Sequence, residues 1–299
     1  MSFRNVIIAS PARLKVQNEQ LVVCTDRDHS MPIEDLSAVL LESRQSTITT
    51  AALSRLGQCG CAVFVCDEKH LPCAVLLPFS HHSRALAAAG SQLSASLPLK
   101  KRLWQQIVIS KIQNQAICLS LNDKRSDEQR LLSMLPRVRS GDTENVEAVA
   151  AQAYFPALFR SGFVREEECM HNAALNYGYA ILRGCMARCL AVYGFLPAFG
   201  IHHHSTLNSF NLADDFMEPF RPVIDLLVSR LDLSGGELTP EIKRALFNCL
   251  NLDILSGGSH HSVAYAMERM VQSFSRSLTQ NEAALCLPTL LETARHRYE

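Results

Sequence analysis

The spacing of the apolar residues changes near residue 80 of the 299-residue chain, and this change constrains the possible folds more than any other feature. Before it, short apolar runs recur at intervals of about ten residues, which is typical of β-strands joined by turns. The predicted strands are residues 6–8, 14–16, 21–23, 39–41, 62–65 and 74–77. A short helix is expected over residues 50–56. Residues 1–80 therefore predict a small β-domain.

After residue 100 the apolar residues recur at helical spacing and predict amphipathic helices. The stripes are Leu103, Ile107, Ile109 and Ile112; Ala173, Leu175, Tyr179 and Leu182; Ile242, Leu246, Cys249 and Leu250; and Met267, Val271 and Phe274. Serine, glycine and proline punctuate the stretch before them, so residues 81–99 are expected to be a linker. The predicted fold class is α+β, with a small N-terminal β-domain over 1–80 and a larger all-α domain over 100–299.

The composition is that of a globular protein, with 47% hydrophobic and 19% charged residues, and excludes a mainly disordered chain. No apolar run approaches 18 residues, and the N-terminal run is too short for a signal peptide. We therefore expect no membrane contact and a cytoplasmic location. The eleven cysteines are an odd number without a Cys-x-x-Cys pair, and we interpret them as small buried residues rather than as disulfides or a zinc site.

Charge is balanced over the whole chain, with 29 basic and 29 acidic residues, but not along it. Residues 100–139 contain nine basic and three acidic side chains, whereas residues 140–220 contain four basic and nine acidic ones. This pattern suits a metal-dependent enzyme that acts on a polyanion, because cations bind phosphates and carboxylates bind the metal. Two solvated helical faces would give the same pattern. The candidate phosphate contacts are Lys100, Lys101, Arg102, Lys111, Lys124, Arg125, Arg130, Arg137 and Arg139, with Arg160, Arg165, Arg183 and Arg188 as additions.

The segment 200–222 is the most informative stretch. Three consecutive histidines, His202, His203 and His204, precede the carboxylates Asp214, Asp215 and Glu218. If residues 209–218 are helical, Asp215 and Glu218 stand three positions apart on one face, where two carboxylates repel unless a cation lies between them. Hard oxygen ligands with one imidazole suit Mg²⁺ or Mn²⁺ better than structural zinc. At most two of the histidines are expected to be ligands, because three consecutive side chains cannot all point one way.

Glu147 is a candidate third ligand, because it begins an alanine-rich run with helical packing. Each candidate also has a plainer interpretation: Glu147 as an exposed helix residue, Asp214 as an ordinary surface residue, and Glu218 as a helix end before Pro219. The motifs of phosphate-binding loops, dinucleotide-binding folds, zinc proteases and α/β-hydrolases are absent from the sequence. Nucleotide hydrolysis, dinucleotide redox chemistry, zinc proteolysis and α/β-hydrolase chemistry therefore lack their usual support in the sequence.

Three stretches occur in an order and at separations that are specific. They are Glu147 with Ala150, Ala151 and Tyr154; residues 172–182; and residues 208–222, which end in Met217-Glu218-Pro219-Phe220-Arg221-Pro222. Together they resemble the CRISPR-associated integrase family, the near-universal catalytic subunit of spacer acquisition. The last stretch is similar to the type II branch, and the short chain resembles its compact II-C form.

The resemblance implies an N-terminal β-domain, a helical catalytic domain and a homodimer that binds a small CRISPR-associated partner dimer. It implies one divalent-metal site per chain, Mg²⁺ or Mn²⁺, held by Glu147, His203 and Glu218 with Asp215 assisting. The implied reaction is an attack by the 3′-hydroxyl of captured double-stranded DNA on the CRISPR repeat, and the same site acts as an endonuclease when water replaces the hydroxyl. The DNA contacts expected from the basic segment are Lys100, Lys101, Arg102, Arg137 and Arg139.

Two alternatives stay open from the residues alone. The first is a zinc-dependent hydrolase that uses the histidine run and a carboxylate. The second is a non-catalytic DNA-binding scaffold in which the acidic cluster is only structural.

Overall fold

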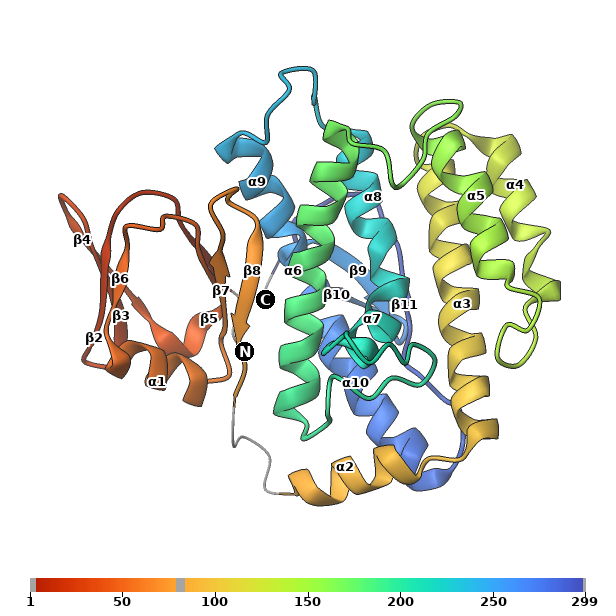
Figure 1. Ribbon diagram of the computed structural model, residues 1–299, viewed down its shortest axis with the longest axis horizontal. Coiled ribbons are helices and arrows are strands. Elements are labelled where there is room, and N and C mark those ends of the chain that lie inside the picture. The colour runs from red at the N-terminus through yellow and green to blue at the C-terminus, as the bar shows by residue number, and fades with distance from the viewer. Residues whose placement is uncertain (1–3, 79–83, 298–299) are drawn as a thin grey trace.

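A computed structural model describes residues 4–78 and 84–297, and its N-terminal part is a β-domain (Figure 1). The domain contains β1 (Arg4–Ile8), β2 (Arg13–Gln17), β3 (Gln20–Cys24), β4 (Asp28–Pro32), β5 (Leu36–Leu41), β6 (Thr47–Ile48), β7 (Ala62–Cys66), β8 (Pro72–Leu76) and the helix α1 (Thr50–Gln58). The strands form two sheets with the orders β1-β5-β7-β8 and β4-β3-β2-β6. The six predicted strands and the predicted short helix are confirmed.

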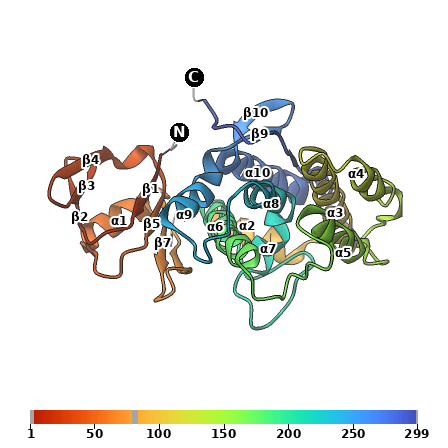
Figure 2. The same cartoon turned by 90° about the horizontal axis from the view of Figure 1, so that it is seen from above.

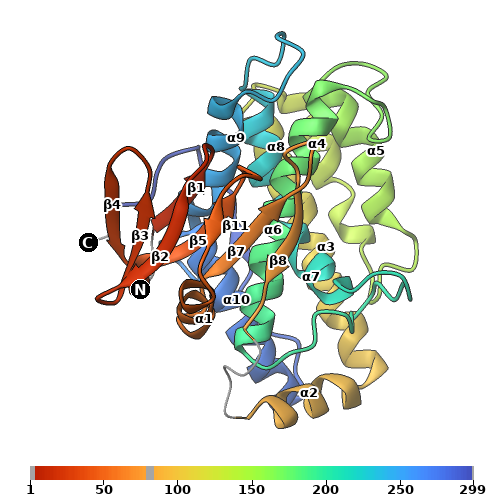
Figure 3. The same cartoon turned by 60° about the vertical axis from the view of Figure 1, so that its left-hand side comes forward.

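In the sheet β1-β5-β7-β8, the central strands β5 and β7 contribute to a different core on each face, because successive side chains along a strand point to opposite faces. On β5 and β7, Leu40 and Phe64 join the large core of the helical domain. Their neighbours Val39 and Val63 join a separate core under α1. Figure 3 shows β7 and β8 lying beside the long helix α6 (Met170–Val192). The core of the β-domain packs against one face of this sheet, and the core of the helical part packs against the other.

The rest of the described chain is mostly helical and lies to one side of the β-domain (Figure 2). Its other helices are α2 (Ala85–Ser94), α3 (Leu97–Ser120), α4 (Arg125–Leu132), α5 (Val146–Leu158), α7 (Asn211–Met217), α8 (Arg221–Ser229), α9 (Pro240–Phe247) and α10 (Val263–Gln280). The short 3₁₀ turn η3 (Glu218–Phe220) joins α7 to α8. The α+β class is confirmed, and α2 and the start of α3 occupy much of the stretch expected as a linker.

The helical part also contains a small antiparallel sheet in the order β10-β9-β11, which the expectation of an all-α domain did not include. Its strands are β9 (Asp253–Ser256), β10 (Ser259–Ser262) and β11 (Pro288–Thr289). Gly257 and Gly258 join the first two strands with positive φ angles of 59° and 80°, as a tight hairpin turn requires. Within the described residues, no helix is long and apolar enough to cross a membrane.

Candidate metal centre

Glu147 is held at the start of α5 by Asp142, which lies three positions before the N-cap residue Asn145. The Asp142 carboxylate accepts hydrogen bonds from the backbone N–H groups of Val146 at 2.9 Å and of Glu147 at 3.0 Å. A carboxylate in this position satisfies two of the amides that a helix start leaves without a partner. The cap fixes the first turn of α5, and the Glu147 side chain, 21% exposed, leaves it beside α3.

Glu218 lies on η3, the turn that joins α7 to α8. The Nδ2 atom of Asn114 on α3 donates to the carbonyl oxygen of Pro219 at 2.8 Å and ties this turn to the middle of α3. The Glu218 side chain is only 5% exposed, and its Oε1 accepts from Arg221 Nε at 2.7 Å. Burial would raise the pKa of Glu218, but the charges of Arg221 and Lys111 outweigh burial and lower this pKa to about 2. Glu218 is therefore an ionised carboxylate in a nearly closed environment.

Lys111 of α3 joins the two glutamates. Its Nζ lies 2.6 Å from Glu147 Oε1 and 2.5 Å from Glu218 Oε2, and its side chain is 10% exposed. The expectation that Lys111 contacts phosphate from the basic segment is therefore wrong for this structure. The Lys111 ammonium lies between two carboxylates that come from α5 and η3, and together with Arg221 it balances their two negative charges.

His203 is oriented by Asp215 of α7, which is completely buried. One Asp215 oxygen accepts from the backbone N–H groups of Ile201 at 2.7 Å and His202 at 3.0 Å. The other accepts from the His203 N–H at 3.1 Å and lies 2.6 Å from His203 Nδ1. This is the carboxylate–histidine arrangement that leaves Nε2 available to a metal. Asp215 therefore acts as a positioning residue for His203.

The three consecutive histidines have different surroundings. His202 stacks on Trp104 with ring centroids 4.1 Å apart, and burial lowers the pKa of His202. His204 Nδ1 lies 2.8 Å from the His202 carbonyl oxygen, at an exposed position. The hydrogen bond to Asp215 raises the pKa of His203, burial opposes the rise, and the charges of Asp215, Glu218 and Glu147 add to it. His203 is thus the histidine whose ring is held by the Asp215 carboxylate and whose pKa is raised by the charges of both glutamates.

The donors suit a hard divalent cation, although the described residues contain no group of three or more His, Cys, Asp or Glu side chains gathered closely enough to hold a metal. Lys111 stands between the two glutamates. Glu218 Oε2 is buried and has the Lys111 ion pair but no well-directed hydrogen bond. Two carboxylates and one imidazole are the ligand types that Mg²⁺ and Mn²⁺ accept.

The five residues predicted to contact DNA lie at the start of α3 and in the segment before α5. Lys101 and Arg102 are exposed and Lys100 is half-buried. Arg137 and Arg139 approach Glu144 at 3.4 and 3.9 Å, and their side chains are 52% and 76% exposed. Their contact with DNA stays a prediction. Arg188, like Lys111, is a buried candidate, and it pairs with Glu268 at 2.8 Å, a structural contact.

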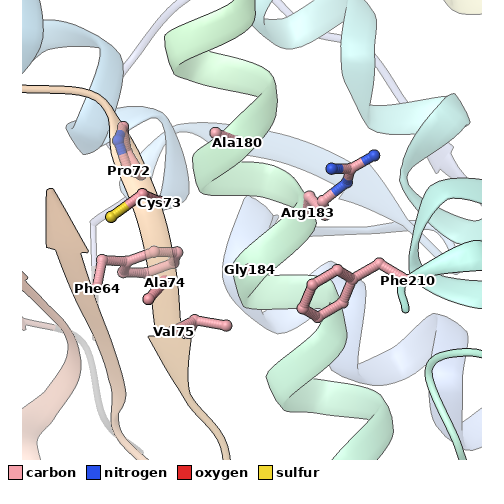
Figure 4. A pocket seen from close by; sticks show the side chains of 9 residues that line it. All are labelled: Phe64, Pro72, Cys73, Ala74, Val75, Ala180, Arg183, Gly184 and Phe210. Atoms are coloured by element: carbon pink, nitrogen blue, oxygen red, sulfur yellow. The ribbon is translucent and has the colours of Figure 1, made fainter. Parts of the chain in front are cut away.

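Two neighbouring cavities run along α6. The first, of about 320 Å³, lies between β8 and α6 and is lined by Phe64, Val75 and Phe210 among others (Figure 4). The second, of about 270 Å³, is lined by Arg165, Tyr179, Arg183 and Arg221 among others. Arg183 lines both, with its guanidinium bound to Asp214 through two hydrogen bonds of 2.7 and 2.8 Å. Arg221 also binds Glu218, so the arginine-lined cavity borders the candidate metal centre.

Comparison with known proteins matches one family. The family model described as "CRISPR associated protein Cas1" covers residues 6–241. The chain is 42% identical over 304 residues to the "CRISPR-associated endonuclease Cas1" of Neisseria meningitidis serogroup C (strain 8013), covering 100% of both chains. A solved "Casposase bound to integration product" has a TM-score of 0.76 at 18% identity, covering 95% of this chain and 92% of that chain. A "Cas6-RT-Cas1--Cas2 complex" has a TM-score of 0.72 at 19% identity, covering 95% of this chain and 36% of that chain.

Proposed function

The chain belongs to the CRISPR associated protein Cas1 family, and we propose that Glu147, His203 and Glu218 form its catalytic metal site. It is a CRISPR-associated endonuclease and integrase of spacer acquisition, which confirms the predicted family, reaction class and enzymatic role. The type II branch suggested by residues 217–222 and the II-C form suggested by the short chain are part of the proposal. The enzymatic role of the family excludes the alternative of a non-catalytic DNA-binding scaffold.

The proposal depends mainly on the observation that Glu147 and Glu218 both contact one side-chain ammonium, that of Lys111. They come from separate helical segments, and both contact Lys111 Nζ. His203, with Nδ1 held by Asp215, presents Nε2 as the third donor. The metal is Mg²⁺ or Mn²⁺, and when bound it would polarise a phosphoryl oxygen and lower the pKa of the attacking hydroxyl. The zinc-dependent hydrolase, which would use the histidine run and a carboxylate, has less support, since His202 stacks on Trp104 and His204 is exposed beside the His202 carbonyl oxygen.

The reaction is a transesterification at phosphorus. The 3′-hydroxyl of the captured DNA loses its proton and its oxygen forms a new P–O bond, while the bond from phosphorus to the leaving 3′-oxygen breaks and that oxygen takes up a proton, so the number of protons is unchanged. With water as the nucleophile the same site cuts DNA. Arg221 holds the ionised Glu218 in place, and Asp215 keeps the His203 ring in one orientation. No side chain needs to form a covalent intermediate.

The partners are proposed from the family. Double-stranded DNA is the substrate, and Lys100, Lys101, Arg102, Arg137 and Arg139 bind its backbone. A homodimer of the chain binds a small CRISPR-associated partner dimer of the Cas2 type. The similarity in fold to the Cas1 part of a solved complex that includes Cas2 supports this assembly.

The decisive test replaces each glutamate by its amide. Glu147→Gln and Glu218→Gln should lower strand transfer of labelled DNA into a repeat-containing plasmid by at least about 1000-fold, because a catalytic metal contributes several kcal/mol. DNA binding should change little by comparison, and circular dichroism should show that both variants are folded. Glu144→Gln is the matched control, because Glu144 is 46% exposed three positions before Glu147 and pairs with Arg137. Strand transfer at wild-type rates in both site variants would refute the proposal.

A further inference from the structure

Lys111 occupies the position between the two glutamates that a metal ligated by both would take. α3 runs between α5 on one side and the α7–α8 segment on the other (Figures 1 and 2). The Lys111 side chain on α3 therefore reaches both carboxylates. The distances from Nζ to the two oxygens are 2.6 and 2.5 Å. They exceed the 2.0–2.1 Å of Mg²⁺–oxygen bonds by only about 0.5 Å.

An ammonium and a divalent cation cannot share this space. Both need the same lone pairs on Glu147 Oε1 and Glu218 Oε2, and both are positive, so they repel strongly at such short range. Lysine is also able to leave, since its ammonium sits on a flexible four-carbon stem. Metal binding through these two oxygens therefore requires Lys111 Nζ to move away.

The two carboxylate oxygens of Glu218 have different partners, so a metal can replace the partner of one oxygen while the other keeps its own. Oε1 accepts from Arg221 Nε at 2.7 Å, whereas Oε2 faces Lys111. The contact with Arg221 can persist when a metal takes Oε2. The structure thus contains one fixed cation, Arg221, and one cation placed at the exchanging oxygens, Lys111.

We propose that Lys111 is a resident counter-ion of the metal site: it holds Glu147 and Glu218 together in the metal-free protein, and the metal displaces it. This inference relies on the proposed function, in which both glutamates are ligands. Lys111 is a positioning residue here, and it has two opposite effects. It stabilises the metal-free fold, and it weakens metal affinity by competition.

The test uses Lys111→Met, which keeps an unbranched side chain one atom shorter and removes its charge. Titration calorimetry of metal-free protein with Mn²⁺ should show affinity at least about tenfold tighter than wild type, since a unit charge no longer competes at contact distance. The metal-free variant should unfold roughly 10 °C lower, because two buried carboxylates lose their counter-ion. Saturating Mn²⁺ should restore most of this loss. If Lys111→Met does not fold, Lys111→Gln should show the same tightening.

Lys243→Met is the matched control. Lys243 and Glu42 form a second buried pair at 2.8 Å, with exposures of 10% and 7%, outside the metal centre. This variant should also unfold at a lower temperature, but with unchanged Mn²⁺ affinity and no restoration by Mn²⁺. Unchanged or weaker Mn²⁺ binding by Lys111→Met overturns the inference. Wild-type Mn²⁺ binding by both Glu147→Gln and Glu218→Gln would instead overturn the proposed metal site itself.

Discussion

Gly200 lies against the two groups that place His203, and it leaves no room for a side chain. A Cβ atom at this position would overlap the His203 carbonyl oxygen and lie 2.8 Å from Asp215 Oδ2. Both neighbours are fixed, since Asp215 is fully buried and accepts hydrogen bonds from the backbone of residues 201–203, here called the histidine loop. The loop can follow the Asp215 carboxylate this closely only because residue 200 is glycine.

Gly200→Ala should therefore push the histidine loop away from Asp215. We expect Mn²⁺ affinity to fall by about tenfold and strand transfer to fall with it, because a misplaced ligand loses its alignment. Titration calorimetry and the integration assay measure the two effects. Gly235→Ala is the control, since no described atom lies within 4 Å of its Cβ position. Wild-type metal binding by Gly200→Ala would show that the loop tolerates the displacement.

Some functional residues were predictable from the sequence, and Lys111 was not. Glu147, His203 and Glu218 belong to specific motifs, although their roles as ligands stay a prediction. Lys111 was grouped with the basic residues around it, because sequence proximity does not show which face of α3 is buried. A signal was present: Trp104, Ile107 and Val108 precede Lys111 at helical spacing and are buried with it. A charged residue on such a stripe needs a partner of opposite charge.

At the scale of elements, Gly184 sets how closely α6 approaches the shared sheet. A Cβ atom there would overlap the Phe64 ring of β7, whose side chain is 1% exposed. We expect Gly184→Ala to lower the free energy of unfolding by about 1–3 kcal/mol, the usual cost of overpacking a core. Gly90→Ala, within α2 and with no described atom within 4 Å, should instead be neutral or raise it by up to about 1 kcal/mol. Denaturant titration of the two variants distinguishes these opposite signs, and equal effects would contradict the packing argument.

Asp225 joins α8 to α5 and α6, because its carboxylate accepts hydrogen bonds from Tyr154 at 3.0 Å and from Tyr179. Burial raises the pKa of Asp225 from its ordinary 3.8 to about 6, and the two tyrosine hydrogen bonds offset part of the rise. The folded protein therefore holds this proton more tightly than the unfolded chain. Its contribution to stability is complete below pH 4 and decreases as the pH rises to about 6.

Asp225→Asn removes this titration and gives a direct test. The unfolding free energy of wild type minus that of Asp225→Asn should decrease between pH 4 and pH 6.5 by up to about 3 kcal/mol. Denaturant unfolding at four or five pH values in this range measures the difference. A difference that stays constant or grows with pH would show that the Asp225 pKa is not raised.

The strands predicted from the sequence are those whose apolar runs supply a core. Leu14, Leu21 and Val39 are completely buried, and their strands were predicted. Two of the strands that were not predicted have little apolar pattern: β4 is an edge strand with an exposed start, and β10 reads Ser-His-His-Ser. Edge strands bury little, so hydrophobic periodicity does not reveal them. Gly257-Gly258 was the available signal for the β9–β10 hairpin.

For the whole molecule, the change in periodicity near residue 80 predicted two parts but not their dependence on each other. In the sheet β1-β5-β7-β8, consecutive residues on the same strand point to opposite faces and join two different apolar cores. Sequence alone shows that such a strand is buried on both sides, and it does not show which distant helix covers it. Here α6 covers one face, so the helical core includes Ala38, Leu40, Ala62 and Phe64 of the β-domain.

A shared sheet predicts that the two parts unfold together. If the helices melted first, the face with Leu40 and Phe64 would be exposed to water at a cost of several kcal/mol, since each such side chain contributes about 1.5–3 kcal/mol. Trp104, the one tryptophan of the sequence, is buried on α3 and reports on the helical part. Its fluorescence and the far-ultraviolet circular dichroism of the whole chain should therefore change at the same denaturant concentration. Phe64→Ala should weaken this coupling and separate the two transitions, whereas well-separated transitions in the wild type would mean that the sheet does not join the parts energetically.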